Sequence, residues 1–168
     1  PGVGSAIIVD QQIYQGANGM AAEIGHMTAG GNRLCNCGRR GCLETYISTH
    51  AIIDDIKVEA DKMPKLMSWI KDGGIISSKN IDEWYSLSDD RLKGIMKEKF
   101  SLFALNVRNA VSLIDPDRVV LIGYMFDLPG VFEEFVNAYK EYDYSLIDKF
   151  VEKNFAYTDG KSTDRCID

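Results

Sequence analysis

The sequence predicts an α/β fold, and three observations indicate it. Residues 6–14 have the turn-separated apolar pattern of a hairpin, residues 89–114 form a long amphipathic stretch, and residues 119–122 are a continuous apolar run. Strands that come before and after helices in this order favour a sheet covered by helices. With 168 residues, 45% of them hydrophobic and 26% charged, the chain has the size and composition of a single globular domain.

The first third of the chain predicts a hairpin, a loop and a helix. Residues 6–9 and 13–14 are expected to be strands joined by the polar turn 10–12. Residues 16–41 are rich in glycine and are expected to form a loop. Apolar residues then recur at helical spacing over 43–60, which predicts one helix after the loop.

The middle of the chain predicts an interrupted region and then a long helix. Pro64 and the Gly73-Gly74 pair interrupt the pattern, so residues 75–88 are expected to be a loop or short helical pieces. Residues 89–114 are expected to form one helix, which ends at Asp115 because a residue before proline avoids the helical region.

The last elements are a strand, a helix and a strand. The apolar run 119–122 predicts a strand buried on both faces, and Gly123 closes it. Pro129 suits the start of a helix. The buried side of that helix is expected to consist of Phe132, Phe135, Val136 and Tyr139. A final strand is expected at residues 154–157.

Charge and hydropathy exclude two classes of partner. The formal net charge is −6, so this chain has no electrostatic footprint for DNA or RNA. No apolar run approaches the roughly 20 residues of a membrane helix, and no targeting segment is visible. We therefore expect a cytoplasmic protein without a membrane partner. The chain opens on a glycine turn that runs directly into an apolar strand, and it stops where a helix could begin, so we expect a fragment of a larger protein.

Three cysteines and a histidine gather in one glycine-rich stretch: His26, Cys35, Cys37 and Cys42. Thiolate sulfur and imidazole nitrogen are the usual ligands of tetrahedral zinc, and a site with four protein ligands is structural because no position is left for water. Gly38 and the glycine at position 41 allow the tight turns that such a loop needs. A disulfide is the alternative, which the few cysteines and the expected reducing interior disfavour.

Three motifs carry a family resemblance. They are Gly2-Val3-Gly4-Ser5-Ala6-Ile7-Ile8, the E-x-G-H sequence of residues 23–26, and the C-x-C-G-x-x-G-C-x-E sequence of residues 35–44. In this order they resemble the ROK family of repressors, open reading frames and sugar kinases. The resemblance implies the C-terminal lobe of an actin-like (ribonuclease H-like, sugar-kinase) fold, with residues 1–168 as one domain. It also implies that the N-terminal lobe and any helix-turn-helix lie outside this chain, and that the full-length protein is a homo-oligomer.

The same resemblance assigns roles to individual residues. Glu23, His26 and Glu44 would bind sugar hydroxyls or a 2-acetamido group, and His26 would also join the three cysteines in holding zinc. Carboxylates accept hydrogen bonds from neighbouring hydroxyls, and a histidine has two ring nitrogens that can face two partners. Without the motif, the two glutamates are ordinary surface acids. Gly2 and Gly4 match the second phosphate turn of the family, and they equally suit an ordinary hairpin turn.

Two departures from the kinase pattern favour a repressor. ROK kinases follow the buried strand with a run of glycines that lets the backbone approach adenosine, whereas here the run is Gly123-Tyr124-Met125-Phe126. We expect these three large side chains to place bulk where a nucleotide would lie. The aspartate that serves the family as general base belongs to the N-terminal lobe, so this chain alone has no catalytic residue and is not expected to be an enzyme.

Three functions remain open at this point. The favoured one is the sugar-sensing part of a ROK transcriptional repressor, which would contact DNA only through a segment outside this chain. The alternative is one lobe of an ATP-dependent sugar kinase of the glucokinase or N-acetylhexosamine kinase type, with ATP as a cofactor only in that case. The third is a zinc-stabilised interaction domain with a decayed sugar site. The residues do not name the sugar.

Overall fold

The computed structural model describes residues 2–140 and the backbone of residues 155–157. Its strands are β1 (Ile8–Val9), β2 (Gln12–Ile13), β3 (Val119–Leu121) and β4 (Phe155–Tyr157). Its α-helices are α1 (Glu44–Ile47), α2 (Thr49–Val58), α3 (Pro64–Lys71), α4 (Ile81–Ser86), α5 (Asp90–Ile114) and α6 (Val131–Lys140). The short 3-10 helices are η1 (Ile24–His26), η2 (Ala60–Lys62) and η3 (Tyr124–Asp127).

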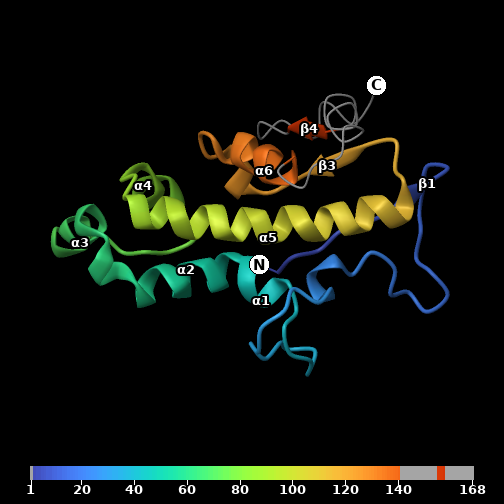
Figure 1. Cartoon of the computed structure of the whole chain (residues 1–168), viewed down its shortest axis with the longest axis horizontal. Coiled ribbons are helices and arrows are strands. Elements are labelled where there is room, and N and C mark those ends of the chain that lie inside the picture. Colours follow the sequence, from blue (N-terminus) through green and yellow to red (C-terminus); the bar gives the residue numbers. More distant parts are fainter. Residues whose placement is uncertain (1, 141–154, 158–168) are drawn as a thin grey trace.

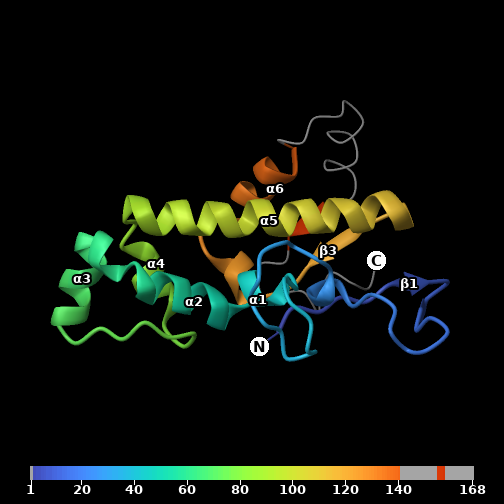
Figure 2. The same cartoon turned by 60° about the horizontal axis from the view of Figure 1, so that its bottom comes forward.

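Helix α5 runs through the middle of the molecule and separates two groups of elements (Figure 1). Helices α1 and α2 lie on one side of it, with the loop that precedes α1 beyond them, and α6 with β3 and β4 lies on the other. A second view again has α6 on the opposite side of α5 from α1 and α2, while β3 passes below α5 in this view (Figure 2). Helix α5 packs against α6, α2 and α1, so it is the element against which both halves of the described chain bury their apolar faces.

The long helix confirms its sequence prediction closely. Its buried positions include Leu92, Met96 and Phe100, which recur at the four-residue spacing of one helix face. Asp115 ends the helix in the left-handed conformation, with φ of 48°, before the proline that cannot continue it. The helix therefore begins and ends where local sequence signals place its ends.

The single helix predicted over residues 43–60 is wrong, because the chain breaks at Ser48. Ser48 has an extended backbone with ψ of 151°, and its hydroxyl accepts a hydrogen bond from the Ala51 N–H at 3.4 Å. A serine in this conformation caps the start of α2, so the pattern divides into α1 and α2. Glu44 consequently begins a short helix of its own, directly after the glycine-rich loop.

Pro64 starts a helix, so the prediction that it interrupts the helical pattern is wrong. It occupies the first position of α3, where a missing N–H has no cost. The buried carboxylate of Asp89 accepts hydrogen bonds from the N–H groups of Lys65 (3.3 Å) and Leu66 (2.8 Å) and so caps this helix from a distant part of the chain. Residues 75–88 contain the short helix α4, as the prediction of loop or short helical pieces allows.

Both predicted strand regions form, but β3 is less buried than expected. Strands β1 and β2 pair antiparallel as a hairpin, in which Gln12 belongs to the second strand. Strand β3 pairs parallel with β4, at the position of the predicted final strand. Leu121 is 5% exposed, whereas Val120 is 41% and Ile122 is 71% exposed. The prediction of burial on both faces is therefore wrong for the described part of the chain, where only one face of β3 meets the core.

The core around α5 contains an aromatic cluster that holds α6 in place. The ring of Phe135 on α6 lies 5.3 Å from Phe103 and 5.9 Å from Phe126, measured between centroids, and 6.3 Å from Tyr139. Aromatic pairs at these separations attract beyond the gain from burying their surface. Phe135 and Tyr139 are buried and Phe132 and Val136 pack partly against the core, so the apolar side predicted for this helix is confirmed.

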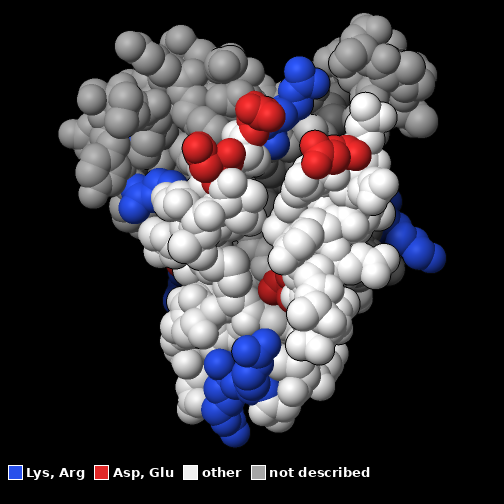
Figure 3. Space-filling model, turned by 90° about the vertical axis from the view of Figure 1, so that its right-hand side faces the viewer, with Lys and Arg blue, Asp and Glu red and all other residues white. Residues whose placement is uncertain are grey.

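The end of the molecule that carries the hairpin is poor in charge. Figure 3 faces this end and shows acidic and basic side chains mainly around the margins of the described surface, with a largely uncharged surface between them apart from an acidic group near the centre. Ile8 (69% exposed) and Ile13 (67%) belong to this end of the molecule. No helix in the described residues combines the length and the apolar character needed to cross a membrane.

Candidate functional site

The four predicted metal ligands lie together. One potential ligand atom from each of His26, Cys35, Cys37 and Cys42 lies within 4.8 Å of those of the other three. The Cys35 sulfur is 3.6 Å from Nδ1 of His26, and the Cys37 sulfur is 3.6 Å from that of Cys42. Cys35 and Cys42 are buried, while Cys37 is exposed, and all three thiols are free of disulfides.

Glycines let the loop bring these ligands together. Gly38 follows Cys37 with φ of 85°, a conformation that residues with a Cβ rarely adopt. Gly41 has φ of 77°, and a Cβ there would lie 2.8 Å from the carbonyl oxygen of Gly30. An alanine at either position would therefore strain the turn, and at position 41 it would also push two backbone segments apart.

The geometry of the cluster fits a tetrahedral zinc ion. Zn–S bonds of about 2.3 Å and Zn–N bonds of about 2.0 Å place neighbouring ligand atoms roughly 3.5–3.8 Å apart. The Cys35–His26 and Cys37–Cys42 separations, both 3.6 Å, fall in that range, and all four ligand atoms lie within 4.8 Å of one another. Three thiols and an imidazole would fill all four positions of zinc, so the donor set suits a metal that organises the loop and leaves no place for a reacting water.

The thiols of the cluster differ in acidity. The backbone N–H and the guanidinium of Arg39 bond to the Cys37 sulfur and lower its pKa from 9.0 to about 6. Burial raises the pKa of Cys42 to about 11. Arg39 is thus the residue of this loop that favours a thiolate, which is the form that binds metal.

His26 lies between the cysteines and Glu23, which is a predicted sugar-binding residue. Its Nδ1 points to Cys35, and its Nε2 lies 4.0 Å from the Glu23 carboxylate. Glu23 is three residues earlier, and 52% of its side chain is exposed. The two nitrogens of one ring therefore face two different chemical environments, an arrangement that lets one side bind metal while the other orients a ligand.

Glu44 lies against the start of the chain. Its Oε2 accepts a hydrogen bond from the Val3 N–H at 2.9 Å, and a Cβ on Gly2 would lie 2.4 Å from the same oxygen. The structure thus brings Glu44 of the predicted sugar set beside Gly2 of the predicted phosphate turn. A Cβ on Gly4, the other glycine of that turn, would meet no atom within 4 Å.

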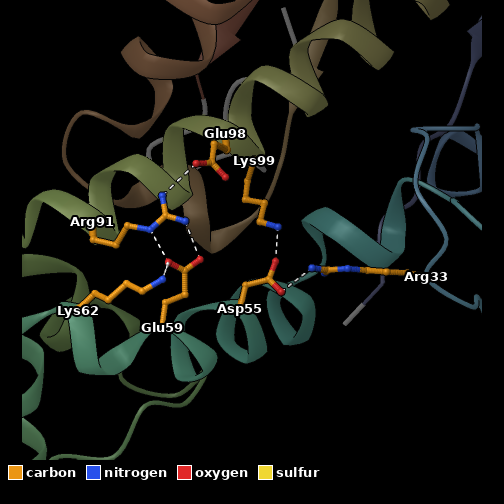
Figure 4. Close-up of polar contacts among 7 residues, drawn as sticks. All are labelled: Arg33, Asp55, Glu59, Lys62, Arg91, Glu98 and Lys99. Carbon is orange, nitrogen blue, oxygen red and sulfur yellow. Dashed lines mark hydrogen bonds and ion pairs between the residues drawn. The ribbon is translucent and has the colours of Figure 1, made fainter.

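An ion-pair network beside the loop of residues 26–42, which holds the predicted metal ligands, is absent from the sequence prediction (Figure 4). Arg33 lies inside the loop, and it donates to Asp55 on α2 at 2.6 Å and to the Thr45 carbonyl on α1 at 3.0 Å. Lys99 on α5 also pairs with Asp55, and only 11% of its side chain is exposed. Arg33 therefore fastens the loop to α1 and α2, and Asp55 extends the connection to α5. The sequence signal for this role was an arginine between the metal ligands.

A second set of pairs lies farther along the same two helices. Arg91 on α5 forms a two-pronged contact with Glu59 after α2, with both separations at 2.6 Å, and it also contacts Glu98 at 3.0 Å. A cleft of about 270 Å³ opens beside the network. Its lining consists of Arg33, Asp55, Val58, Glu59, Ile95, Glu98 and Lys99. Every charged group in this lining has an opposite partner, so the cleft is a seam between helices that offers no free charge to a ligand.

The network predicts a loss of stability in acid. Arg91 and Lys62 lower the pKa of Glu59 from 4.5 to about 2. Since the folded pKa is the lower one, this contribution is complete above pH 4.5 and disappears as the pH falls towards 2. We expect Glu59→Gln to lower the melting temperature at pH 7 and to leave a smaller difference from wild type at pH 2.5, measured by circular dichroism. Equal differences at both pH values would contradict the role of the Glu59 charge, and metal loss in acid affects both proteins alike.

The large side chains after β3 do not all face the same way. Phe126 is 7% exposed and packs in the aromatic cluster, so the expectation that it obstructs a ligand site is wrong. Tyr124 is 37% exposed, and its hydroxyl shares a hydrogen bond with the hydroxyl of Thr49 at the start of α2. A tyrosine therefore lies just beyond the carboxyl end of β3, the place where open α/β sheets commonly bind their ligands.

A family model supports the motif resemblance. The model of the ROK family matches residues 1–163 of this chain. A glucokinase of Halalkalibacterium halodurans is 31% identical over 126 residues, covering 73% of this chain and 38% of the relative. A xylose repressor of Caldicellulosiruptor bescii is 30% identical over 132 residues, covering 71% of this chain and 31% of the relative. The chain therefore spans less than half the length of these relatives.

Solved structures agree with the fold. A ROK family glucokinase from Streptomyces griseus, in complex with glucose and AMPPNP, superposes with a TM-score of 0.68 and 26% identity. The match covers 83% of this chain and 46% of that protein. The described elements thus have the arrangement of part of an actin-like sugar-kinase fold.

Proposed function

Because the chain belongs to the ROK family, we propose that it is the sugar-sensing part of a transcriptional repressor of that family. Homologues include both repressors and kinases, so the choice depends on a feature of this chain. That feature is Tyr124, whose phenol is 37% exposed just beyond the end of β3 and is held there by a hydrogen bond with Thr49. A phenol at this position takes space that adenosine would need and removes the close backbone approach that glycine allows.

The proposed sugar site consists of Glu23, His26 and Glu44 around the cysteine cluster. Two carboxylates can accept hydrogen bonds from neighbouring hydroxyls of a neutral sugar, and the Nε2 of His26 lies on the Glu23 side of the ring. Zinc bound by Cys35, Cys37, Cys42 and Nδ1 of His26 would fix the orientation of that ring and the start of α1. The metal would therefore shape the ligand site and take no part in chemistry.

In the full-length repressor, sugar binding would change operator affinity through a segment outside this chain, which is a coupling between two sites. The acidic charge of this chain, −6, fits a ligand-binding part that does not itself contact DNA. We take residues 1–168 as the C-terminal lobe, and we place the protein in the reducing cytoplasm, where thiols stay available for zinc. We also propose that the full-length protein forms homo-oligomers.

The proposal predicts the loss of sugar binding in a Glu44 variant. We expect Glu44→Ala to weaken sugar binding by at least about tenfold, because a carboxylate that bonds ligand hydroxyls contributes on the order of 1.5–3 kcal/mol. Isothermal titration calorimetry of the full-length protein with D-glucose, D-xylose and N-acetylmannosamine measures it. Glu98→Ala is the matched control, since 65% of the Glu98 side chain is exposed and it belongs to the helix seam. Unchanged affinity in Glu44→Ala would remove Glu44 from the site.

The alternative function is an ATP-dependent sugar kinase, and the glucokinase relative supports it. Titration of the same full-length protein with ATP and Mg²⁺ distinguishes the two functions. We expect no binding heat for ATP in the millimolar range, because Tyr124 lies at the end of β3. Measurable nucleotide binding, or phosphate transfer to any of the three sugars, would overturn the repressor and establish the kinase.

A further inference from the structure

The segment Gly2–Gly4 is held between two motif elements that are far apart in sequence. Its Val3 N–H donates to Oε2 of Glu44 at 2.9 Å, across 41 positions of the chain. On its other side, the Val3 carbonyl lies so near the buried Gly25 that a Cβ on that glycine would be 2.2 Å from the carbonyl oxygen. One peptide segment thus contacts the start of α1 with its donor and η1 with its acceptor.

Gly25 is required here for space and not for backbone conformation. It does not have a positive φ, whereas nearby glycines such as Gly30 and Gly31 do. The atom that an added Cβ would meet belongs to the backbone of Val3, which cannot rotate away as the end of a side chain could. The glycine of the E-x-G-H sequence therefore permits a close approach between that motif and the start of the chain.

Only one oxygen of Glu44 takes part in this contact. Oε2 accepts the Val3 N–H, and no bond from any described residue is recorded at Oε1. The Glu44 residue is partly buried, and its Oε1 is not among the buried polar side-chain atoms of the described residues that lack a partner, so this oxygen is accessible. A carboxylate with one oxygen fixed by a backbone N–H has a restricted orientation, and a hydroxyl that bonds the other oxygen meets an acceptor already in place.

We propose that Glu44 is a positioning residue as well as a ligand residue: its Oε2 holds segment Gly2–Gly4 against Gly25, while its Oε1 receives the sugar. The ligand half of this statement rests on the proposed function, and the positioning half does not. Each bond holds the carboxylate in the orientation that the other needs, so a bound sugar would also order the contact with Val3, and a well-held segment would in turn strengthen sugar binding. Sugar binding at Glu44 thereby changes how firmly the segment Gly2–Gly4, which precedes β1, is held.

The positioning role is tested without any ligand by the hydrogen exchange rate of the Val3 amide, measured by NMR on the zinc-loaded protein. We expect Glu44→Ala and Gly25→Ala each to raise this rate about tenfold, because the first removes the acceptor and the second displaces the segment. Gly94→Ala is the matched control, since a Cβ there makes an ordinary contact with Arg91 at 3.5 Å. If Gly25→Ala does not fold, Glu44→Gln, which weakens the acceptor, replaces it. Unchanged Val3 exchange in the Glu44 variants overturns the positioning role.

The coupling is tested by repeating the measurement with D-glucose, D-xylose and N-acetylmannosamine. We expect the sugar that binds to slow the exchange of the Val3 amide several-fold in wild type. The control Gly94→Ala should show the same slowing. A sugar that binds without changing Val3 exchange overturns the coupling and leaves the proposed function intact. If none of the three sugars binds while the Glu44 variants still raise the exchange rate of the Val3 amide, the positioning role stands and the proposed function loses its support.

Discussion

Replacing Cys37 by alanine is expected to lower the free energy of unfolding by at least about 3 kcal/mol in the presence of zinc, and by little in its absence. Cys37 is exposed, so its side chain contributes little packing, and the loss must come from the metal. A change of this size corresponds to a fall in melting temperature of roughly 6–12 °C for a chain of this length. Urea or thermal unfolding with and without a chelator measures it.

The matched control lies one residue away. Asn36 is exposed in the same turn and offers no thiol, so Asn36→Ala is expected to change the free energy of unfolding by less than about 0.5 kcal/mol in either condition. Elemental analysis should find one zinc per wild-type chain. Less than half an equivalent of zinc, or an equal cost of Cys37→Ala with and without chelator, would contradict a structural zinc site.

The proximity of the four predicted ligands could be predicted because they are close together in the sequence. His26 and the three cysteines lie within seventeen consecutive residues, and the loop buries Cys35 and Cys42. The long helix α5 was predictable for a similar reason, since its apolar spacing and the proline after Asp115 are both readable from neighbouring residues. A structural feature that depends only on neighbouring residues can therefore be predicted from the sequence.

Features that depend on distant partners could not be predicted. Val3 meets Glu44 across 41 positions, Asp55 meets Lys99 across 44, and no local pattern of charge specifies either pair. The same limit explains Phe126, whose burial depends on the arrival of Phe103 and Phe135 from two other helices. For β3, an apolar run indicates that the strand can be buried on both faces. Whether Val120 is actually buried depends on which other elements pack over it.

The second large effect is expected at Asp55. Asp55→Ala should lower the free energy of unfolding by about 2–3 kcal/mol, because it leaves the Lys99 ammonium, only 11% exposed, without its partner. Burial by itself would raise the pKa of Asp55, yet the hydrogen bonds from Arg33 and Lys99 outweigh it and the pKa lies below its usual value. The carboxylate is therefore ionised and paired at neutral pH. Chemical denaturation at pH 7 measures the change.

Two further variants separate a lost pair from an orphaned charge. Glu98→Ala removes the same charge from a side chain that is 65% exposed, and it should cost less than about 0.5 kcal/mol. The double variant Asp55→Ala with Lys99→Met should regain at least half of the loss, because methionine fills the space of the lysine stem without a charge. If the double variant is as unstable as Asp55→Ala, the cost does not arise from the unpaired ammonium.

Asp55 also anchors Arg33, so replacing Asp55 should speed the release of zinc from the proposed metal site. With Asp55 replaced, the Arg33 side chain keeps its hydrogen bond to the Thr45 carbonyl on α1 but loses its ion pair with α2, so fewer bonds hold the loop between the predicted ligands. We expect Asp55→Ala to speed the transfer of zinc to a competing chelator several-fold, whereas Lys99→Met, which leaves the Arg33 pair in place, should not. Equal rates in both variants would show that the seam stabilises the helices without holding the loop. A difference would establish Arg33 as the connection between the metal site and the helical layer.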